Sequence, residues 1–160
     1  MPKKTVPFTI EDIKALTEKY PTPFYIYDEK AIRDNIRVFL KEFSWIDFKE
    51  YFAVKATPNP SIMKILSDEG CGMDCSSMPE LVLAESIGCS GRQIMFTSND
   101  TPKQEYEKAF SLGAVINLDD YSHIKSIEHM ISPDSSMCLR YNPGNRKGNE
   151  IIGQLKDSKF

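Results

Sequence analysis

The sequence has few of the features that mark secreted, metal-binding or nucleic-acid-binding proteins. Its 160 residues include four cysteines, whose spacing fits neither a paired Cys-x-x-Cys zinc site nor a dense disulfide framework. We therefore expect no metal site, small buried thiols at Cys71 and Cys75, and a reducing, cytoplasmic setting. The formal net charge of -3 comes without any long run of one sign. That distribution argues against nucleic acid as a partner.

Long apolar stretches are missing as well. The most apolar segments, such as residues 80–85, are interrupted within a few residues, and no apolar region follows the Met-Pro-Lys-Lys start. A membrane-spanning helix needs about 20 mostly apolar residues, and a signal peptide needs an apolar core. The sequence thus predicts neither membrane insertion nor export. With 41% hydrophobic and 27% charged residues, it is typical of an ordinary globular domain. Without signs of a nucleic-acid or membrane partner, we expect it to act on a small molecule.

From Lys49 onward, short strand-like runs alternate with helix-like segments. The runs are residues 51–54, 73–75, 93–97, 114–118 and 137–141. Residues near their ends (Lys55, Cys75, Thr97, Leu118 and Arg140) are 20, 22, 21 and 22 positions apart. Such alternation indicates an α/β fold with a parallel sheet, in which each strand is followed by a helix.

Two architectures fit this spacing, a doubly wound sheet and a (β/α)8 TIM-type barrel. Both place their chemistry at the C-terminal ends of the strands. No Gly-x-Gly-x-x-Gly follows a strand, which argues against a nucleotide-binding doubly wound domain. A barrel typically needs about 250 residues. We therefore expect residues 1–160 to form an incomplete, N-terminal portion of a barrel.

Helix signals occupy the gaps between the runs. Ser61 is expected to cap the helix after the first run, and Pro79 and Pro102 are expected in the first turns of later helices. Three glycines are expected to end helices: Gly70, Gly88 and Gly113.

The two ends of the chain differ from this repeat. Residues 1–21 predict a leading helix, from about residue 9 to 20, and a turn. Residues 24–27 read as a strand, after which Asp28 is expected to cap a helix with a 3.6-residue apolar period. Residues 142–160 lack periodicity and are expected to form a long loop and the truncated start of the next unit.

The residue most suggestive of chemistry is Lys55, at the end of the apolar run 51–54. A lysine buried there would favour the neutral amine, which can act as a nucleophile or as a Schiff-base partner. The alternative is an ordinary lysine whose side chain reaches solvent from the strand end.

Three ordered segments resemble the pyridoxal-phosphate decarboxylases of the alanine-racemase fold, especially diaminopimelate decarboxylase. They are Tyr51-Phe-Ala-Val-Lys55-Ala-Thr-Pro-Asn-Pro60, Gly72-Met-Asp-Cys-Ser-Ser-Met-Pro-Glu-Leu81 and Leu139-Arg-Tyr-Asn-Pro-Gly144. The opening Pro23-Phe-Tyr-Ile-Tyr-Asp28 is similar too. The resemblance covers the chain from about residue 22 onward.

The resemblance implies a role for four residues. Lys55 would form the Schiff base with pyridoxal phosphate, and Asp74 would orient it by charge and hydrogen bonding. Arg140 would lie near the phenolic edge of the cofactor ring. Glu80 is assigned to the cofactor site by a weaker match, and favourable placement at a helix N-terminus is an equally good explanation for it. Lys55, Asp74 and Arg140 all end predicted strands, so they are expected at one edge of the sheet.

The resemblance also implies a function. We expect decarboxylation of a diamino or basic amino acid, first of all meso-diaminopimelate to L-lysine, by a homodimer. Carboxynorspermidine, ornithine and arginine decarboxylases are rivals, and a non-catalytic homologue that binds a partner is a different class of explanation. The family's phosphate loop, substrate arginine and partner-donated segment come later in the chain, so the 160 residues alone are expected to be inactive.

Overall fold

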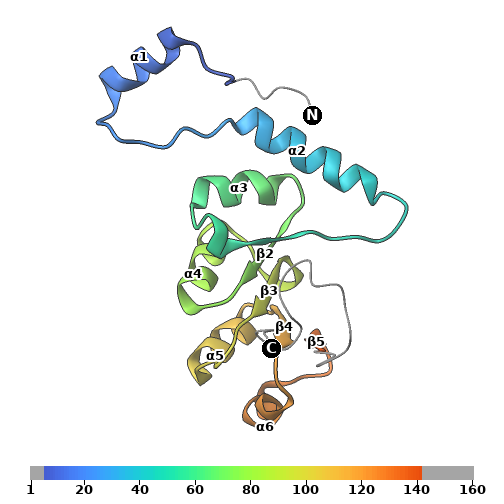
Figure 1. Ribbon diagram of the computed structural model, residues 1–160. Helices are drawn as coiled ribbons and strands as arrows, with labels where there is room; N and C mark the ends of the chain where they lie inside the picture. Colours follow the sequence, from blue (N-terminus) through green and yellow to red (C-terminus); the bar gives the residue numbers. More distant parts are fainter. Residues whose placement is uncertain (1–5, 142–160) are drawn as a thin grey trace, which may run out of the picture.

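The computed structural model describes residues 6–141 and consists of a parallel sheet with helices (Figure 1). The strands are β1 (Tyr51–Ala53), β2 (Gly72–Cys75), β3 (Ile94–Thr97), β4 (Val115–Leu118) and β5 (Met137–Leu139). The helices are α1 (Ile10–Lys19), α2 (Glu29–Glu42), α3 (Pro60–Asp68), α4 (Met78–Ser86), α5 (Lys103–Ser111) and α6 (Ile124–Ile127). Short 3₁₀ turns are η1 (Val54–Ala56), η2 (Gly91–Gln93), η3 (Tyr121–His123) and η4 (Glu128–Met130). The five strand-like runs expected from Lys49 onward all form strands, with ends shifted by at most two residues.

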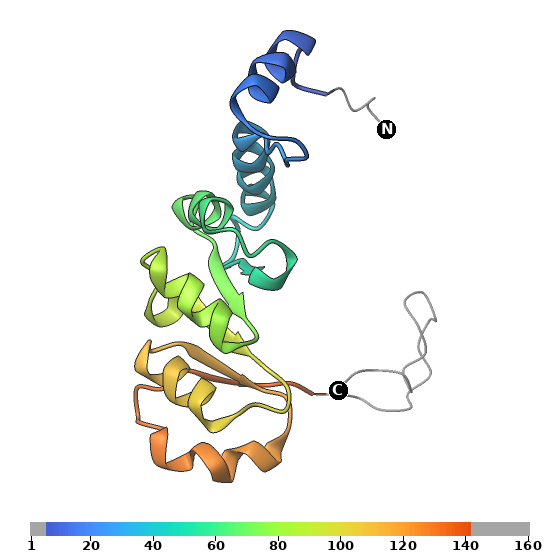
Figure 2. The ribbon, with the colours of Figure 1, turned by 90° about the vertical axis from the view of Figure 1, so that its left-hand side faces the viewer.

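The order of the strands decides between the two architectures. The sheet runs β1-β2-β3-β4-β5, and each strand is parallel to its neighbour. A doubly wound sheet reverses its strand order at a switch point, and the described residues contain no such reversal. Helices α3, α4 and α5 lie side by side on one face of the sheet (Figure 2). This unidirectional winding is that of a TIM-type barrel, as the sequence predicts.

The apolar core lies between the sheet and these helices. Successive strand residues point to opposite faces, and those facing the helices are almost fully buried: Met73, Cys75, Ile94, Phe96, Ile116 and Leu118. We call the other side the open face; its residues include Tyr51, Gly72, Asp74, Met95, Thr97, Val115 and Asn117. Below the C-terminal ends of the strands, part of this face lines a hollow of about 730 Å³ together with Lys49 and Arg92.

Gly72 lets the strands approach one another closely on the open face. A Cβ at this position would lie 2.5 Å from the Tyr51 ring and 2.8 Å from the carbonyl oxygen of Gln93. The Tyr51 hydroxyl in turn donates a hydrogen bond to the carbonyl oxygen of Arg92, at 2.7 Å. Tyr51 therefore crosses β2 and ties β1 to the turn η2 that precedes β3, which leaves no room for a side chain at position 72.

Most expected helix boundaries are confirmed, and two are wrong. Gly70, Gly88 and Gly113 follow α3, α4 and α5 with positive φ, as expected of C-terminal stops, and Pro79 lies in the first turn of α4. Ser61 does not cap α3. The Asn59 side chain does so, accepting from the backbone N–H groups of Ser61 and Ile62, because Pro60 already starts the helix. Pro102 precedes α5 as its N-cap residue and is not in its first turn.

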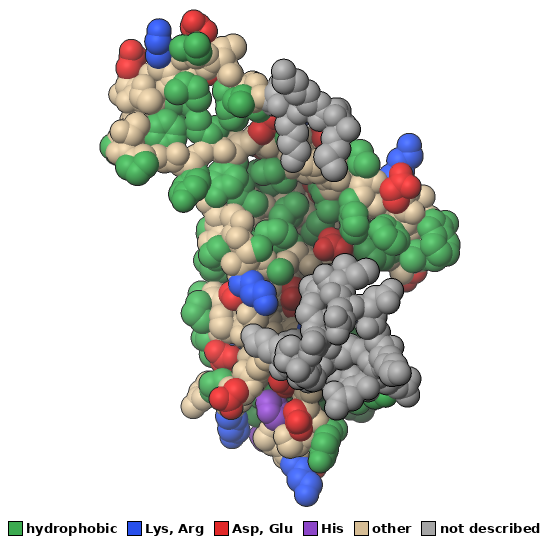
Figure 3. All heavy atoms as spheres, viewed as in Figure 1, with side chains coloured by type: hydrophobic (Ala, Val, Ile, Leu, Met, Phe, Trp, Pro, Cys, Tyr) green, Lys and Arg blue, Asp and Glu red, His purple; other side chains and the backbone are tan. Residues whose placement is uncertain are grey.

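The N-terminal region lies apart from the sheet. Helix α1 has a capping box formed by Thr9 and Asp12, and Asp28 caps α2 as expected. The expected strand at residues 24–27 is wrong: the segment is extended but pairs with no strand of the described chain. Phe24 and Ile26 are half-buried, whereas Tyr25 is 91% and Tyr27 48% exposed, and hydrophobic groups gather here on the surface (Figure 3).

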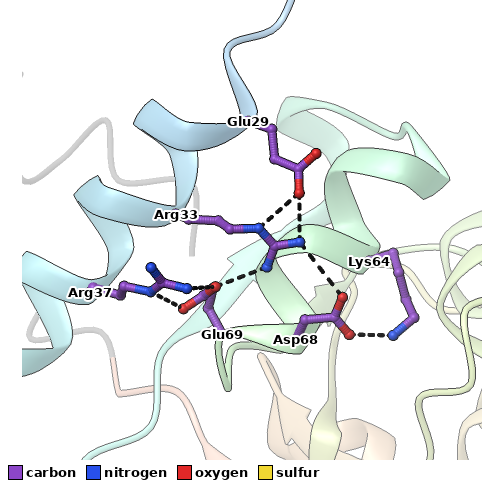
Figure 4. A network of polar contacts seen from close by, with 6 residues as sticks. All are labelled: Glu29, Arg33, Arg37, Lys64, Asp68 and Glu69. Carbon is purple, nitrogen blue, oxygen red and sulfur yellow. Dashed lines mark hydrogen bonds and ion pairs between the residues drawn. The ribbon is translucent and has the colours of Figure 1, made fainter.

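A network of charged side chains joins α2 to the end of α3 (Figure 4). Glu69 accepts from Arg33 Nη1 at 2.8 Å and from Arg37 Nε at 2.6 Å. Arg33 also pairs with Glu29, one turn earlier on α2, and lies 3.9 Å from Asp68. Ile32 and Ile36 of α2 pack against the core next to this network. Helix α2 is thus held by both charge and apolar contacts.

None of the helices formed by residues 6–141 is long and apolar enough to cross a bilayer. The expected long loop at residues 142–160 lies outside the described residues, as does the end of the third resembling segment.

Candidate cofactor site at the C-terminal ends of the strands

Lys55 lies just beyond the C-terminal end of β1, in the 3₁₀ turn η1. Val54, beside it, is fully buried and anchors the turn, and the Thr57 N–H donates to the Val54 carbonyl oxygen at 3.1 Å. Lys55 itself is exposed. Of the two alternatives for Lys55, the described chain therefore has the one in which the lysine is exposed to solvent, because the strand ends at Ala53 and Lys55 follows it in a short turn. The amine is accessible to a ligand above the strand ends.

Asp74 is the half-buried carboxylate of the site. It lies on the open face of β2, pairs with Ala53 of β1 and Met95 of β3 in the register of the sheet, and faces away from the core. Its Oδ1 atom is buried and has no hydrogen-bond partner. Burial raises the pKa of Asp74, and the Thr97 hydroxyl and the positive charges of Lys55 and Arg140 oppose that rise. The side chains of Thr97, Lys55 and Arg140 therefore all act on the Asp74 carboxylate.

Arg140 and Glu80 complete the set expected from the sequence. Arg140 directly follows β5, and its backbone N–H donates to the carbonyl oxygen of Leu118 at 2.8 Å. Because all strands are parallel, Lys55, Asp74 and Arg140 share the C-terminal edge of the sheet. Glu80, in the first turn of α4, accepts from the backbone N–H of Ser76 at 2.8 Å and from its hydroxyl. Glu80 thus holds the turn between β2 and α4, and its charge raises the pKa of Asp74.

Two further polar residues at this edge were missed by the sequence analysis. Thr97 ends β3 and Asn117 lies on β4, paired with it in the sheet register. The Asn117 Nδ2 donates to Thr97 Oγ1 at 3.2 Å. Each is an unremarkable polar residue in a strand when taken alone. The signal that could have found them is alternation, since both occupy strand ends on the same face as Asp74.

The donor set suits an organic cofactor that carries charged and hydrogen-bonding groups. An amine, a carboxylate and a guanidinium come from three different strands, and a buried carboxylate oxygen without a partner is costly unless a ligand or water satisfies it. Residues 6–141 hold no cluster of three or more His, Cys, Asp or Glu side chains that could bind a metal.

Comparison with known proteins identifies the family. Residues 29–160 match the family model described as the pyridoxal binding domain of pyridoxal-dependent decarboxylases. The chain belongs to this family. The cofactor expected from the sequence, pyridoxal phosphate, is therefore confirmed. The unpartnered Asp74 Oδ1 and the accessible Lys55 amine suit a cofactor with charged and hydrogen-bonding groups. The resemblance inferred from the three segments is confirmed as well.

Individual relatives agree with the family. Protein TabA of Pseudomonas amygdali pv. tabaci is 43% identical over 91% of this chain. Diaminopimelate decarboxylase of Methanothermobacter thermautotrophicus is 32% identical over 82% of it. The crystal structure of diaminopimelate decarboxylase from Helicobacter pylori, complexed with L-lysine, matches 92% of the chain with a TM-score of 0.79 and 27% identity.

The chain spans about a third of these proteins, namely 34% of TabA, 31% of the Methanothermobacter enzyme and 38% of the Helicobacter structure. The barrel fold is therefore confirmed for its N-terminal portion. In that portion lies the strand-end edge with Lys55, Asp74 and Arg140.

Proposed function

We propose that the complete protein is a pyridoxal-phosphate-dependent amino-acid decarboxylase in which Lys55 holds the cofactor. Membership of the pyridoxal binding family supports this proposal, and the observation that carries it is the shared edge of Lys55, Asp74 and Arg140. When bound, pyridoxal phosphate serves as an electron sink that stabilises the carbanion left by loss of a carboxylate. The residues of this chain supply attachment, orientation and charge.

Each residue has a distinct part in the proposal. The Lys55 amine provides the covalent attachment and is accessible at the end of β1. Asp74 presents a buried carboxylate oxygen to the bound group and attracts positive charge there. Arg140 places a fixed cation at the same edge, where it would stabilise negative charge on the cofactor ring. Glu80 acts indirectly, through the turn at Ser76 that follows Asp74.

We propose meso-diaminopimelate as the substrate and L-lysine as the product. The Ala-Val-Lys-Ala-Thr-Pro-Asn-Pro segment around Lys55 and the likeness to two diaminopimelate decarboxylases support this choice. Carboxynorspermidine, ornithine and arginine remain rival substrates. A cytoplasmic homodimer completes the proposal; the four cysteines of the described chain are all free thiols, consistent with a reducing compartment.

The proposal predicts that Lys55 alone carries the cofactor. Borohydride reduction of the complete protein loaded with pyridoxal phosphate, followed by peptide mapping, should place the label on Lys55. Lys64 is a matched control, since it lies on α3 and pairs with Asp68. Lys55→Ala should abolish decarboxylation while leaving the thermal midpoint of the cofactor-free protein nearly unchanged, because an exposed amine contributes little to packing. Label on Lys64 would refute the assignment.

Carbon dioxide release from a panel of substrates tests the rest. Meso-diaminopimelate should be turned over with the largest kcat/KM, ahead of carboxynorspermidine, ornithine, arginine and lysine. A different order would replace the substrate and leave the reaction class standing. Complete absence of turnover, with cofactor bound at Lys55, would favour the rival explanation of a non-catalytic homologue that acts by binding a partner.

A further inference from the structure

Three polar side chains lie next to one another on the open face, at the C-terminal ends of β2, β3 and β4. They are Asp74, Thr97 and Asn117. Thr97 and Asn117 are register partners, and the Asn117 Nδ2 donates to Thr97 Oγ1 at 3.2 Å. Asp74 belongs to the neighbouring strand, where its partner Met95 lies two residues before Thr97. The side chains at positions 95 and 97 point to the same face, so Thr97 stands between the other two.

The hydrogen-bonding capacity of Thr97 determines which of its neighbours it accepts from and which it can donate to. A hydroxyl has one hydrogen to donate and lone pairs that accept. The oxygen of Thr97 accepts from Asn117, so its hydrogen is available to the Asp74 carboxylate. Burial raises the pKa of Asp74, and a Thr97 hydroxyl directed at the carboxylate lowers it, in agreement with this arrangement.

Other charged groups also act on Asp74, and they must be separated from Thr97. Lys55, beyond β1, and Arg140, beyond β5, favour the ionised carboxylate. Glu80, on α4, opposes it. Cys75, the next residue on β2, points to the core, where burial and nearby negative charges raise the pKa of its thiol to about 12. Thr97 is the uncharged member of the set, so its removal changes hydrogen bonding without changing the net charge.

We propose that Thr97 and Asn117 are positioning residues for Asp74. The Asn117 amide fixes the Thr97 hydroxyl, and the hydroxyl orients the neighbouring Asp74 carboxylate, so that the buried Oδ1 remains for a bound group. The proposal rests on the proposed function only in taking that group to be pyridoxal phosphate.

The test measures Asp74 directly in the complete protein without cofactor. Carboxyl carbons of aspartate are labelled with ¹³C, and the Asp74 signal, assigned with Asp74→Asn, is followed by NMR as a function of pH. Thr97→Val, which keeps the shape and loses the hydroxyl, should move the midpoint upward by about 0.5 to 1 pH unit, the equivalent of one hydrogen bond. Thr97→Ser, which keeps the hydroxyl, should restore the original midpoint.

A second variant acts on the other side of the pair. In Asn117→Asp the new carboxylate accepts the Thr97 hydroxyl hydrogen and adds a like charge, so the Asp74 midpoint should rise further than in Thr97→Val. Thr101→Val is the matched control, because it removes a threonine hydroxyl from the loop after β3 that is not among the groups acting on Asp74. It should leave the midpoint unchanged. An unchanged midpoint in both Thr97→Val and Asn117→Asp would overturn the proposal.

Cofactor binding then separates this proposal from the proposed function. The affinity for pyridoxal phosphate, measured by its visible absorbance, should fall several-fold in Thr97→Val, recover in Thr97→Ser and stay unchanged in Thr101→Val. If the unmodified protein binds no pyridoxal phosphate, the proposed function fails, while the titration of Asp74 still decides whether Thr97 and Asn117 position it. If the unmodified protein binds and Thr97→Val binds equally well, the positioning role toward the cofactor is wrong.

Discussion

Residues 51–139 bury most of their large apolar side chains, whereas residues 6–48 leave many of theirs exposed. The sheet region has a continuous core made by β2, β3, β4 and the helices that cover them. Neither α1 nor α2 contains a fully buried residue. Instead α2 is joined to the sheet region by Ile32, Ile36 and the charged network around Glu69. Substitutions of similar size should therefore cost far more in the sheet region than in the N-terminal region.

The largest effect is expected from Phe96→Ala. Phe96 is 1% exposed and packs edge-to-face on Tyr106, with ring centroids 5.9 Å apart. Removing such a ring from a core costs about 3 to 5 kcal/mol. The free energy of local opening can be followed by thiol labelling of Cys75, the register partner of Phe96, whose buried thiol reacts only when the sheet opens.

Val38→Ala serves as the control in the N-terminal region. Val38 is 63% exposed on α2, and its truncation should leave the labelling rate of Cys75 unchanged within about twofold, because exposed substitutions usually cost under about 0.5 kcal/mol. If Phe96→Ala and Val38→Ala accelerated the labelling of Cys75 equally, the two regions would not differ in their sensitivity to substitution.

A smaller effect is expected from Gly72→Ala on the open face. The new Cβ would meet the Tyr51 ring and the Gln93 carbonyl oxygen at under 3 Å. Overpacking of this kind costs about 1 to 3 kcal/mol. Tyr51→Ser should relieve the contact with the ring but not the one with the backbone, so the double variant should recover part of the loss in thermal midpoint. Full stability of Gly72→Ala alone would contradict the close approach of β1, β2 and β3.

The two regions also differ in how far the sequence predicted them. The strands of the sheet were predicted because each buried run is bounded by glycine, proline or a capping residue, and these are local signals. Residues 24–27 have the same apolar and aromatic composition, but a strand also needs a neighbour, which no local pattern can supply. Ser61 lost the capping role to Asn59 because the Pro60 ring already starts the helix.

The candidate site was predicted as far as single motifs allow. Lys55, Asp74 and Arg140 were expected at one edge because the strand ends recur at a nearly constant interval along the chain, as in a parallel sheet. The choice of these three residues came from the segments that resemble the decarboxylases. The exposure of Lys55 depends on where β1 gives way to η1, which the apolar run at 51–54 does not mark. Thr97 and Asn117 became recognisable only through their pairing across two strands.

A pH-dependent effect is expected from Glu69→Gln, at the junction of the two regions. Arg37 and Arg33 lower the pKa of Glu69, so its charge stabilises the folded state above the ordinary pKa of about 4.3, and this contribution is lost as the pH falls through the lowered value. The thermal midpoint of Glu69→Gln should lie below that of the unmodified protein at pH 7, and the gap should begin to close near the ordinary pKa and vanish only below the lowered one. Added salt should narrow the gap at neutral pH.

Glu29→Gln is the matched control for this junction. Glu29 contacts Arg33 but lies on α2 itself and is 59% exposed, so its loss leaves the link between α2 and α3 intact. At every pH, the thermal midpoint of Glu29→Gln should lie closer to that of the unmodified protein than the thermal midpoint of Glu69→Gln does. A larger effect of Glu29→Gln would mean that the network stabilises α2 internally and does not join the regions.

The smallest effect on global stability is expected from Thr9→Ala, at the start of α1. The Thr9 hydroxyl accepts from the Asp12 N–H at 3.1 Å, and the Asp12 carboxylate accepts from the Thr9 N–H at 2.9 Å. Loss of such a cap costs a helix about 1 kcal/mol, equivalent to about a fivefold change in local opening. Because α1 buries no residue, that cost should remain within the helix. Amide hydrogen exchange of residues 10–19 should accelerate about fivefold while exchange in β2, β3 and β4 is unchanged.

Thr17→Ala is the matched control in the same helix. The Thr17 hydroxyl only donates to the Lys14 carbonyl oxygen, so its removal should accelerate exchange little. Faster exchange in the sheet after Thr9→Ala would show that α1 and the sheet region unfold as one unit, against the separation of the two regions.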